Sequence, residues 1–180
     1  MAHDAIHPGF DDALLKPGDV APERWVAALA YLKAWAGLAL RQPAHGPVVL
    51  GSDTTCIKSG HMIGTPVDAN EAGAMIRQLS GGHHEVVTGV ALIDVRTGRR
   101  HLFTDSARVA VGHIPESEIS RYLESGQWKG KAGAYNLRDR INAGWPMTFE
   151  GDETTIMGLP MGRLLRLLDE MSRNPVSESL

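Results

Sequence analysis

One carboxylate in this sequence stands where it could carry out chemistry, directly after a short apolar run. Residues 48–50 (Val-Val-Leu) predict a buried strand ending at Gly51, and Ser52, Asp53 and two threonines follow. Open α/β sheets commonly bind their ligands at the carboxyl ends of strands. A carboxylate there can bind a metal ion or accept a proton from water. An aspartate after a strand is also a common helix cap or turn residue, so its position leaves both roles open.

A second candidate is the glycine-rich segment 130–135, which reads Gly-Lys-Ala-Gly-Ala-Tyr. Small residues let the backbone approach a ligand closely, and Lys131 can pair with a phosphate as a point charge. The spacing does not match a phosphate-binding P-loop. The alternative is a solvated lysine on a tight turn.

Histidine and cysteine chemistry has less support in this sequence. His83 and His84 are adjacent, and neighbours in a strand point to opposite faces, so they cannot easily share one metal ion. No cysteine or carboxylate stands at zinc-ligand spacing around them, and we expect a turn role. Cys56 is the single cysteine and has no evident histidine partner, so we expect a small packed residue rather than a nucleophile.

Charge and composition narrow the range of partners. The formal net charge is -3 and the pI about 6.2, which lacks the basic excess of proteins that bind nucleic acids. Nucleotides remain possible ligands, because a few lysines and backbone amides can hold phosphates. One cysteine forms no internal disulfide, and no run of about 18 apolar residues could span a bilayer. We therefore expect a cytoplasmic protein that binds no nucleic acid and no membrane.

Helices and strands are expected to alternate along one α/β domain that covers residues 1–180, with a mixed sheet. Residues 1–18 are expected to be an irregular lead-in. Apolar spacing predicts helices over 22–40, 68–80, 115–126 and 161–171, the second capped by Asp68 with Glu71 and the last burying Leu164, Leu165, Leu167 and Leu168. Strands are predicted over 48–51, near 57–63, over 85–95 and 100–111 as a hairpin, and over 141–150.

Several segments, taken in order, resemble the Maf family of nucleotide pyrophosphatases. They are residues 50–54 (Leu-Gly-Ser-Asp-Thr), 64–68 (Gly-Thr-Pro-Val-Asp) with 71–72, 79–83 with 87–90, Tyr122 with 125–126, 131–135 and 158–160. The resemblance runs from about Asp12 onward. Several spaced motifs in a fixed order are far more specific than any one of them.

The resemblance implies both a fold and an activity. The fold would be an elongated mixed β-sheet flanked by helices, similar to the inosine-triphosphate pyrophosphatases, with a cleft between two lobes. The activity would be hydrolysis of the α–β phosphate bond of a nucleoside triphosphate, such as dTTP, UTP or a modified nucleotide, to a monophosphate and pyrophosphate. A divalent metal, Mg²⁺ or Mn²⁺, would assist, and a homodimer is expected.

The resemblance also implies roles for single residues. Asp53 would be the catalytic carboxylate, either as a base for water or as a metal ligand. Thr54 would help to select the base. Lys33 and Lys131 would neutralise phosphate charge, and Asp12 stands where the family usually has an acidic residue.

Four departures from the family pattern bear on activity. The family normally begins with a strand and a Ser-x-x-Arg-Arg loop opening a helix, and no such segment precedes Asp12, so either these elements are missing or the start was assigned too late. Thr65 replaces a lysine, Gln127 an acidic residue and Arg138 a glutamine, all expected to face substrate. Arg138 would compensate for part of the missing positive charge. The alternative is a catalytically impaired, nucleotide-binding regulatory protein linked to cell division.

Overall fold

The computed structural model describes residues 4–7, 9, 15–42 and 44–173. Its helices are α1 (Pro22–Ala39), α2 (Ala69–Leu79), α3 (Glu116–Glu124), α4 (Leu137–Asn142), α5 (Glu153–Ile156), α6 (Met161–Arg173) and a short 3-10 helix, η2 (Ala132–Ala134). Its strands are β1 (Val48–Lys58), β2 (His61–Ile63), β3 (Gly82–Asp94), β4 (Arg100–Val111) and β5 (Met147–Glu150). The α/β class predicted from the sequence is confirmed.

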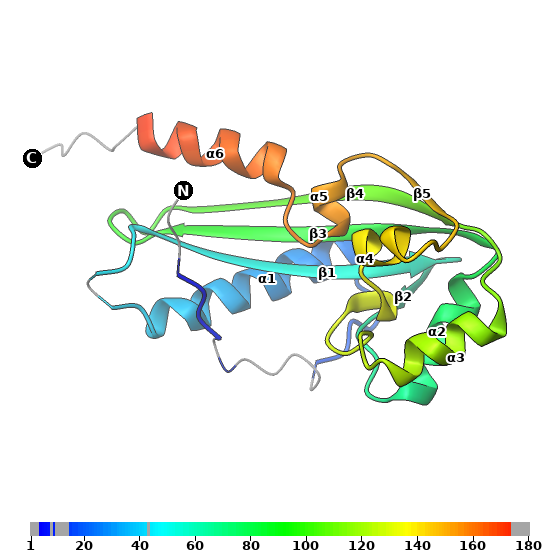
Figure 1. Ribbon diagram of the computed structural model, residues 1–180. Helices are drawn as coiled ribbons and strands as arrows, with labels where there is room; N and C mark the ends of the chain where they lie inside the picture. The colour runs from blue at the N-terminus through cyan, green and yellow to red at the C-terminus, as the bar shows by residue number, and fades with distance from the viewer. Residues whose placement is uncertain (1–3, 8, 10–14, 43, 174–180) are drawn as a thin grey trace, which may run out of the picture.

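The described strands form one five-stranded sheet in the order β2-β1-β3-β4-β5 (Figure 1). All four pairings are antiparallel, whereas a mixed sheet with some parallel pairings was predicted. The predicted hairpin is the long β3–β4 pair. Strand β2 pairs only with Cys56, Ile57 and Lys58 of β1, so among the described strands none pairs with the outer edge of β1 before Cys56.

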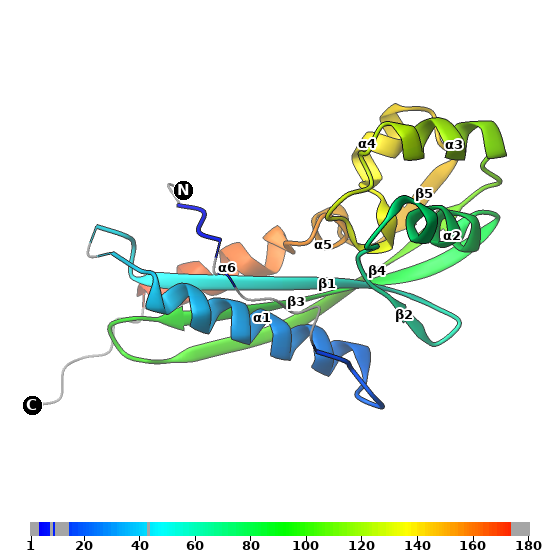
Figure 2. The same ribbon diagram turned by 90° about the horizontal axis from the view of Figure 1, so that it is seen from below.

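Helices cover both faces of the long sheet. Helix α1 lies on one face and α6 on the other (Figure 2). Under α1, Ala30 and Ala34 pack on Ala91 and Ile93 of β3. On the opposite face, Leu164 of α6 packs on residues of β3 and β4 that include Leu92 and Phe103. The alternation of side chains along each strand therefore supplies two separate cores.

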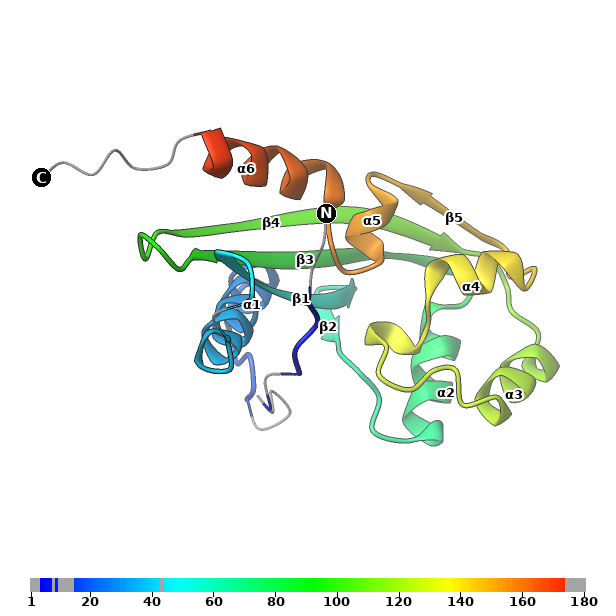
Figure 3. The same cartoon turned by 60° about the vertical axis from the view of Figure 1, so that its left-hand side comes forward.

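A third and larger core fills the other end of the sheet. Helices α2, α3 and α4 gather there (Figure 3), and α2 contacts α3 and η2. Its buried side chains include Ile76 and Leu79 of α2, Ile119 and Tyr122 of α3, and Leu137 of α4. The helices therefore form two groups along the sheet, with α1 and α6 toward one end.

Most helix predictions are confirmed. The first predicted helix matches α1, and Asp68 caps α2 by accepting a hydrogen bond from the Glu71 backbone N–H at 2.8 Å. The Glu71 carboxylate in turn accepts one from the Val67 N–H at 2.7 Å, which completes a capping arrangement at this helix start. The described residues between 4 and 17 contain no helix or strand.

Two predictions near the end of the chain are wrong. The strand predicted over 141–150 is shorter, because α4 continues to Asn142 and only β5 is extended. Asn136 caps α4 by accepting from the Asp139 N–H at 3.0 Å, and this cap was not recognised in the sequence. In α6, Leu165 is exposed rather than buried, since only one side of this helix faces the sheet. None of the described helices is long and apolar enough to cross a membrane.

Candidate active site

Asp53 lies in the middle of β1, so the prediction that it follows a short strand is wrong. The strand continues through Thr55, Cys56 and Ile57, which are paired with β3, and Asp53 itself pairs with Gly89. The polar residues after Gly51 do not end the strand, because their backbone groups join the antiparallel ladder with β3. Asp53 is therefore held by a rigid element rather than by a loop.

Asp53 faces α1 and forms an ion pair with Lys33. The Lys33 Nζ lies 2.6 Å from the Asp53 Oδ1, and the two side chains are 27% and 10% exposed. The structure thus brings together the catalytic candidate and one of the two predicted phosphate-binding lysines. A carboxylate and an ammonium in this arrangement offer a base or metal ligand beside a fixed positive charge.

Two glycines let α1 approach the sheet closely enough for this ion pair. A β-carbon at Gly51 would stand 2.5 Å from the Ala34 backbone nitrogen and would also clash with the Ala30 carbonyl oxygen. One at Gly89 would stand 2.5 Å from the Val26 carbonyl group. Any side chain at either position would push α1 away from β1.

Thr54 points to the opposite face of β1 from Asp53. It lines a cavity of about 210 Å³, and its hydroxyl lies 2.8 Å from that of Thr88. The other lining residues come from three regions: Cys56 and Val86 of the sheet; Gly130, Lys131, Ala132, Tyr135 and Asn136; and Ile156, Met157 and Gly158. The structure therefore brings Thr54 and Lys131 to one cavity, and separates them from Lys33 and Asp53 by the thickness of the strand.

Lys131 enters the cavity wall through an unusual backbone path. Gly133 and Ala134 both adopt left-handed φ angles, of 65° and 64°, which turn the chain sharply after Lys131. A β-carbon at Gly133 would stand 2.7 Å from the Cys56 Sγ, so only glycine fits there. The Lys131 Nζ lies 3.6 Å from an Asp139 carboxylate oxygen, and this lysine is only partly exposed.

The remaining predicted site residues lie elsewhere. Arg138 is exposed, pairs with Glu153 at 2.5 Å and does not line the cavity. Thr65 is exposed on the segment before α2. Gln127 accepts a hydrogen bond from the Arg140 Nη2 at 2.5 Å, so its partner is a protein side chain. Asp12 lies outside the described residues.

A protein-built metal cage is not evident among the described residues. They contain no group of three or more His, Cys, Asp or Glu side chains that could hold a metal ion. Mg²⁺ usually keeps several waters and binds one or two carboxylates together with substrate phosphates. Asp53 fits this second mode as a single ligand of a metal that arrives with a triphosphate.

His84, Tyr135 and Cys56 form a buried group behind the cavity. His84 lies in β3 rather than in the predicted turn, and its Nε2 is 2.7 Å from the Tyr135 hydroxyl. Burial lowers the pKa of His84 to about 4 and raises that of Cys56 to about 12. Both side chains are therefore neutral at pH 7. The prediction that Cys56 is a packed residue is confirmed.

Two polar residues near the cavity were not singled out in the sequence. Thr88 is fully buried beneath Thr54, and Asn136 lines the cavity while it caps α4. Thr88 belongs to the segment 87–90 of the family resemblance, but no local pattern indicated a role at the site, because its place opposite Thr54 depends on the register between β1 and β3. Asn136 had a helix-cap signal in the sequence, with Asp139 three residues later.

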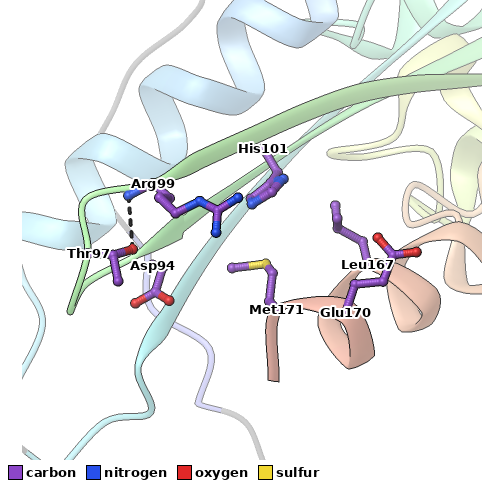
Figure 4. A pocket seen from close by; sticks show the side chains of 7 residues that line it. All are labelled: Asp94, Thr97, Arg99, His101, Leu167, Glu170 and Met171. Atoms are coloured by element: carbon purple, nitrogen blue, oxygen red, sulfur yellow. Dashed lines mark hydrogen bonds between the residues drawn. The ribbon is translucent and has the colours of Figure 1, made fainter. Parts of the chain in front are cut away.

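A second cavity of about 110 Å³ lies at the far end of the β3–β4 hairpin (Figure 4). Arg99 and His101 of β4 and Glu170 and Met171 of α6 are among its lining residues. Asp94, also in its wall, is held by Arg96 at 3.0 Å, which contributes to a lowered pKa for this carboxyl group. None of the predicted site residues that the structure describes lines this cavity.

Comparison with known proteins agrees with the motifs. The sequence matches the Maf-like protein family over residues 1–171. A dTTP/UTP pyrophosphatase of Pelotomaculum thermopropionicum is 37% identical over 158 residues, which cover 88% of this chain and 81% of that protein. One of Aromatoleum aromaticum is 40% identical, covering 85% and 73%, and a nucleoside triphosphate pyrophosphatase of Xylella fastidiosa is 35% identical, covering 83% and 78%. The chain therefore belongs to the Maf family.

Proposed function

We propose that this protein is a nucleoside triphosphate pyrophosphatase, which hydrolyses the α–β phosphate bond of dTTP, UTP or a related nucleotide. The observation that carries the proposal is the Lys33–Asp53 pair, held at 2.6 Å on a strand edge with no strand partner among the described residues. The names of the similar proteins support the same activity.

The edge position of β1 explains how one substrate could use residues on both faces. Asp53 points to the α1 face and Thr54 to the cavity, and a ligand against the outer edge of the strand can reach around it to both. The cavity, at about 210 Å³, is smaller than pockets that enclose a drug-sized ligand, so it suits one ring of a nucleotide. The phosphates would then lie toward Asp53.

The proposed reaction is attack of water on the α phosphorus with pyrophosphate as the leaving group. Asp53 takes the proton of the attacking water or holds the metal, and Lys33 stabilises the oxygens that gain charge. Mg²⁺ or Mn²⁺ bound to the triphosphate would neutralise charge on its oxygens.

The proposal also covers the oligomeric state of the protein and its place in the cell. We expect a homodimer, supported by exposed apolar side chains on the α1 face: Trp35 is 51% and Leu102 49% exposed. Light scattering during gel filtration should give twice the chain mass, and a monomer mass would reject the dimer. Because nucleoside triphosphates are cytoplasmic metabolites, we expect the protein to act in the cytoplasm.

The activity is tested by pyrophosphate release from a panel of standard and modified nucleoside triphosphates with Mg²⁺ or Mn²⁺. We expect Asp53→Asn to lower kcat by at least about 100-fold, as loss of a general base does. Glu85→Gln, an exposed carboxylate on β3, is the matched control and should keep full activity. Absence of turnover on every nucleotide would favour the impaired, nucleotide-binding alternative.

A further inference from the structure

Thr54 belongs to a chain of hydrogen bonds that crosses the sheet beneath the cavity. Thr54, Thr88 and Asp105 are direct neighbours on β1, β3 and β4. The Thr88 hydroxyl donates to the Thr155 backbone carbonyl at 2.8 Å and lies 2.8 Å from the Thr54 hydroxyl. The Thr155 hydroxyl donates to Asp105 at 2.7 Å. Thr88 and Thr155 are both fully buried, so water does not compete for these bonds.

The single proton on each hydroxyl fixes the direction of this chain. A carbonyl oxygen can only accept, so the proton of Thr88 must point to Thr155. If it pointed to Thr54 instead, two acceptor oxygens would face each other 2.8 Å apart inside the protein. Thr54 must therefore donate its own proton to Thr88. What Thr54 presents to the cavity is the acceptor side of its oxygen.

Two other polar side chains of the cavity offer donors, whereas the Tyr135 hydroxyl lies 2.7 Å from the His84 Nε2 and is engaged there. The Lys131 ammonium carries three N–H donors and no acceptor atom. The Asn136 carbonyl oxygen already accepts from the Asp139 N–H at 3.0 Å, which leaves the side-chain NH₂ as a donor. The cavity thus combines one fixed acceptor with two donor side chains. Gly158 lies beside this acceptor, since a β-carbon there would be in van der Waals contact with the Thr54 hydroxyl at 3.4 Å.

We propose that Thr88 is a positioning residue that makes Thr54 an obligatory acceptor, and that the cavity thereby selects the imide edge of uracil or thymine. This inference rests on the proposed function for its choice of ligand. An imide has one N–H between two carbonyl oxygens, which complements one acceptor and two donors. Cytosine has a bare ring nitrogen and an amino group instead. Guanine has a ring N–H but carries an amino group on one side of it.

The first test measures binding, so that it does not depend on turnover. Non-hydrolysable α,β-imido analogues of UTP and CTP are titrated calorimetrically into the wild type, Thr88→Val and Thr88→Ser. We expect the wild type to prefer the uridine analogue and Thr88→Val to reduce this preference by at least about tenfold, because Thr54 can then rotate its proton into the cavity. Thr88→Ser keeps the hydroxyl and should keep the preference. Thr148→Val, at an exposed threonine of β5, is the control for the substitution itself.

A purely structural role for Thr88 would weaken both analogues equally and leave the ratio unchanged, and that result would overturn the inference. A second measurement needs no variant: the α,β-imido analogue of N3-methyl-UTP should bind the wild type at least about tenfold more weakly than that of UTP. Equal affinity would also overturn it. Loss of pyrophosphate release together with retained uridine preference would reject the proposed activity and leave the role of Thr88 standing.

Discussion

Alternation along β1 decides what each of its polar residues can reach. Asp53 meets Lys33 beneath α1, whereas Thr54, one residue later, meets Thr88 and the cavity. Replacing either residue should therefore have a separate effect, on the chemical step for Asp53 and on nucleotide choice for Thr54. Because alternation turns the two side chains to opposite faces, each meets a polar partner of its own, and both polar residues can stand inside the strand.

Gln127 bears on stability rather than on substrate binding. Arg140 is only 8% exposed, its guanidinium lies 4.3 Å from the Tyr122 ring centroid, and its described side-chain acceptor is the neutral amide of Gln127. Gln127→Glu would add a negative charge to the acceptor and turn this hydrogen bond into an ion pair, and we expect it to raise the free energy of unfolding by about 1 kcal/mol. Urea unfolding at pH 7 measures this. Gln42→Glu, at an exposed position, is the control, and a Gln127→Glu protein no more stable than the wild type would contradict the explanation.

His84 should make stability depend on pH. Its pKa is about 4 in the folded protein, because burial disfavours the charged ring, against about 6.5 in the unfolded chain. Between these values the unfolded chain binds more protons, so the free energy of unfolding falls as the pH drops from about 6.5 to about 4, by up to about 1.4 kcal/mol per pH unit.

Unfolding curves at pH 7 and pH 5 test this dependence. His84→Gln should flatten the difference between the two pH values, whereas His83→Gln, an exposed neighbour on the other side of the strand, should leave it as in the wild type. A His84→Gln protein with the wild-type difference would show that another group is responsible.

At the scale of elements, the contact between α1 and the sheet holds the candidate site together. Gly51 and Gly89 allow the helix backbone to touch the strands. We expect Gly51→Ala to destabilise the protein by about 1–3 kcal/mol, as overpacking does, and to lower activity by moving Lys33 away from Asp53. Gly46→Ala, where a β-carbon meets open space, is the control. Equal unfolding midpoints for the two variants would contradict the close packing.

Elements with a clear apolar period were predictable, and those defined by polar contacts were not. The spacing of apolar residues located α1, α2, α3 and the β3–β4 hairpin. The sequence did not reveal that β1 continues through Asp53, because its polar residues are satisfied by partners from distant segments, such as Gly158, which accepts from Ser52 at 2.6 Å. Helix α4 was not predicted because the residues that follow its cap, Asn136, show no strong apolar period.

At the scale of the whole molecule, the cavity is assembled from segments about 100 residues apart, such as Thr54 and Gly158. Local patterns do not show which distant segments meet, so the role of Thr54 in base selection came from the family resemblance alone. Lys131 was also indicated by its glycine-rich segment. The two faces of β1 were beyond prediction for the same reason, since they depend on which helix covers which side. The unpaired edge of β1 among the described strands is the feature that allows both faces to serve one ligand.

The most direct test of the central claim is the identity of the products, followed by ³¹P NMR during hydrolysis of UTP with Mg²⁺ by the wild-type protein. Cleavage at the α–β bond predicts UMP and pyrophosphate in equal amounts, with no UDP at any time. Release of UDP and inorganic phosphate, or an unchanged UTP spectrum, would contradict cleavage at the α–β bond.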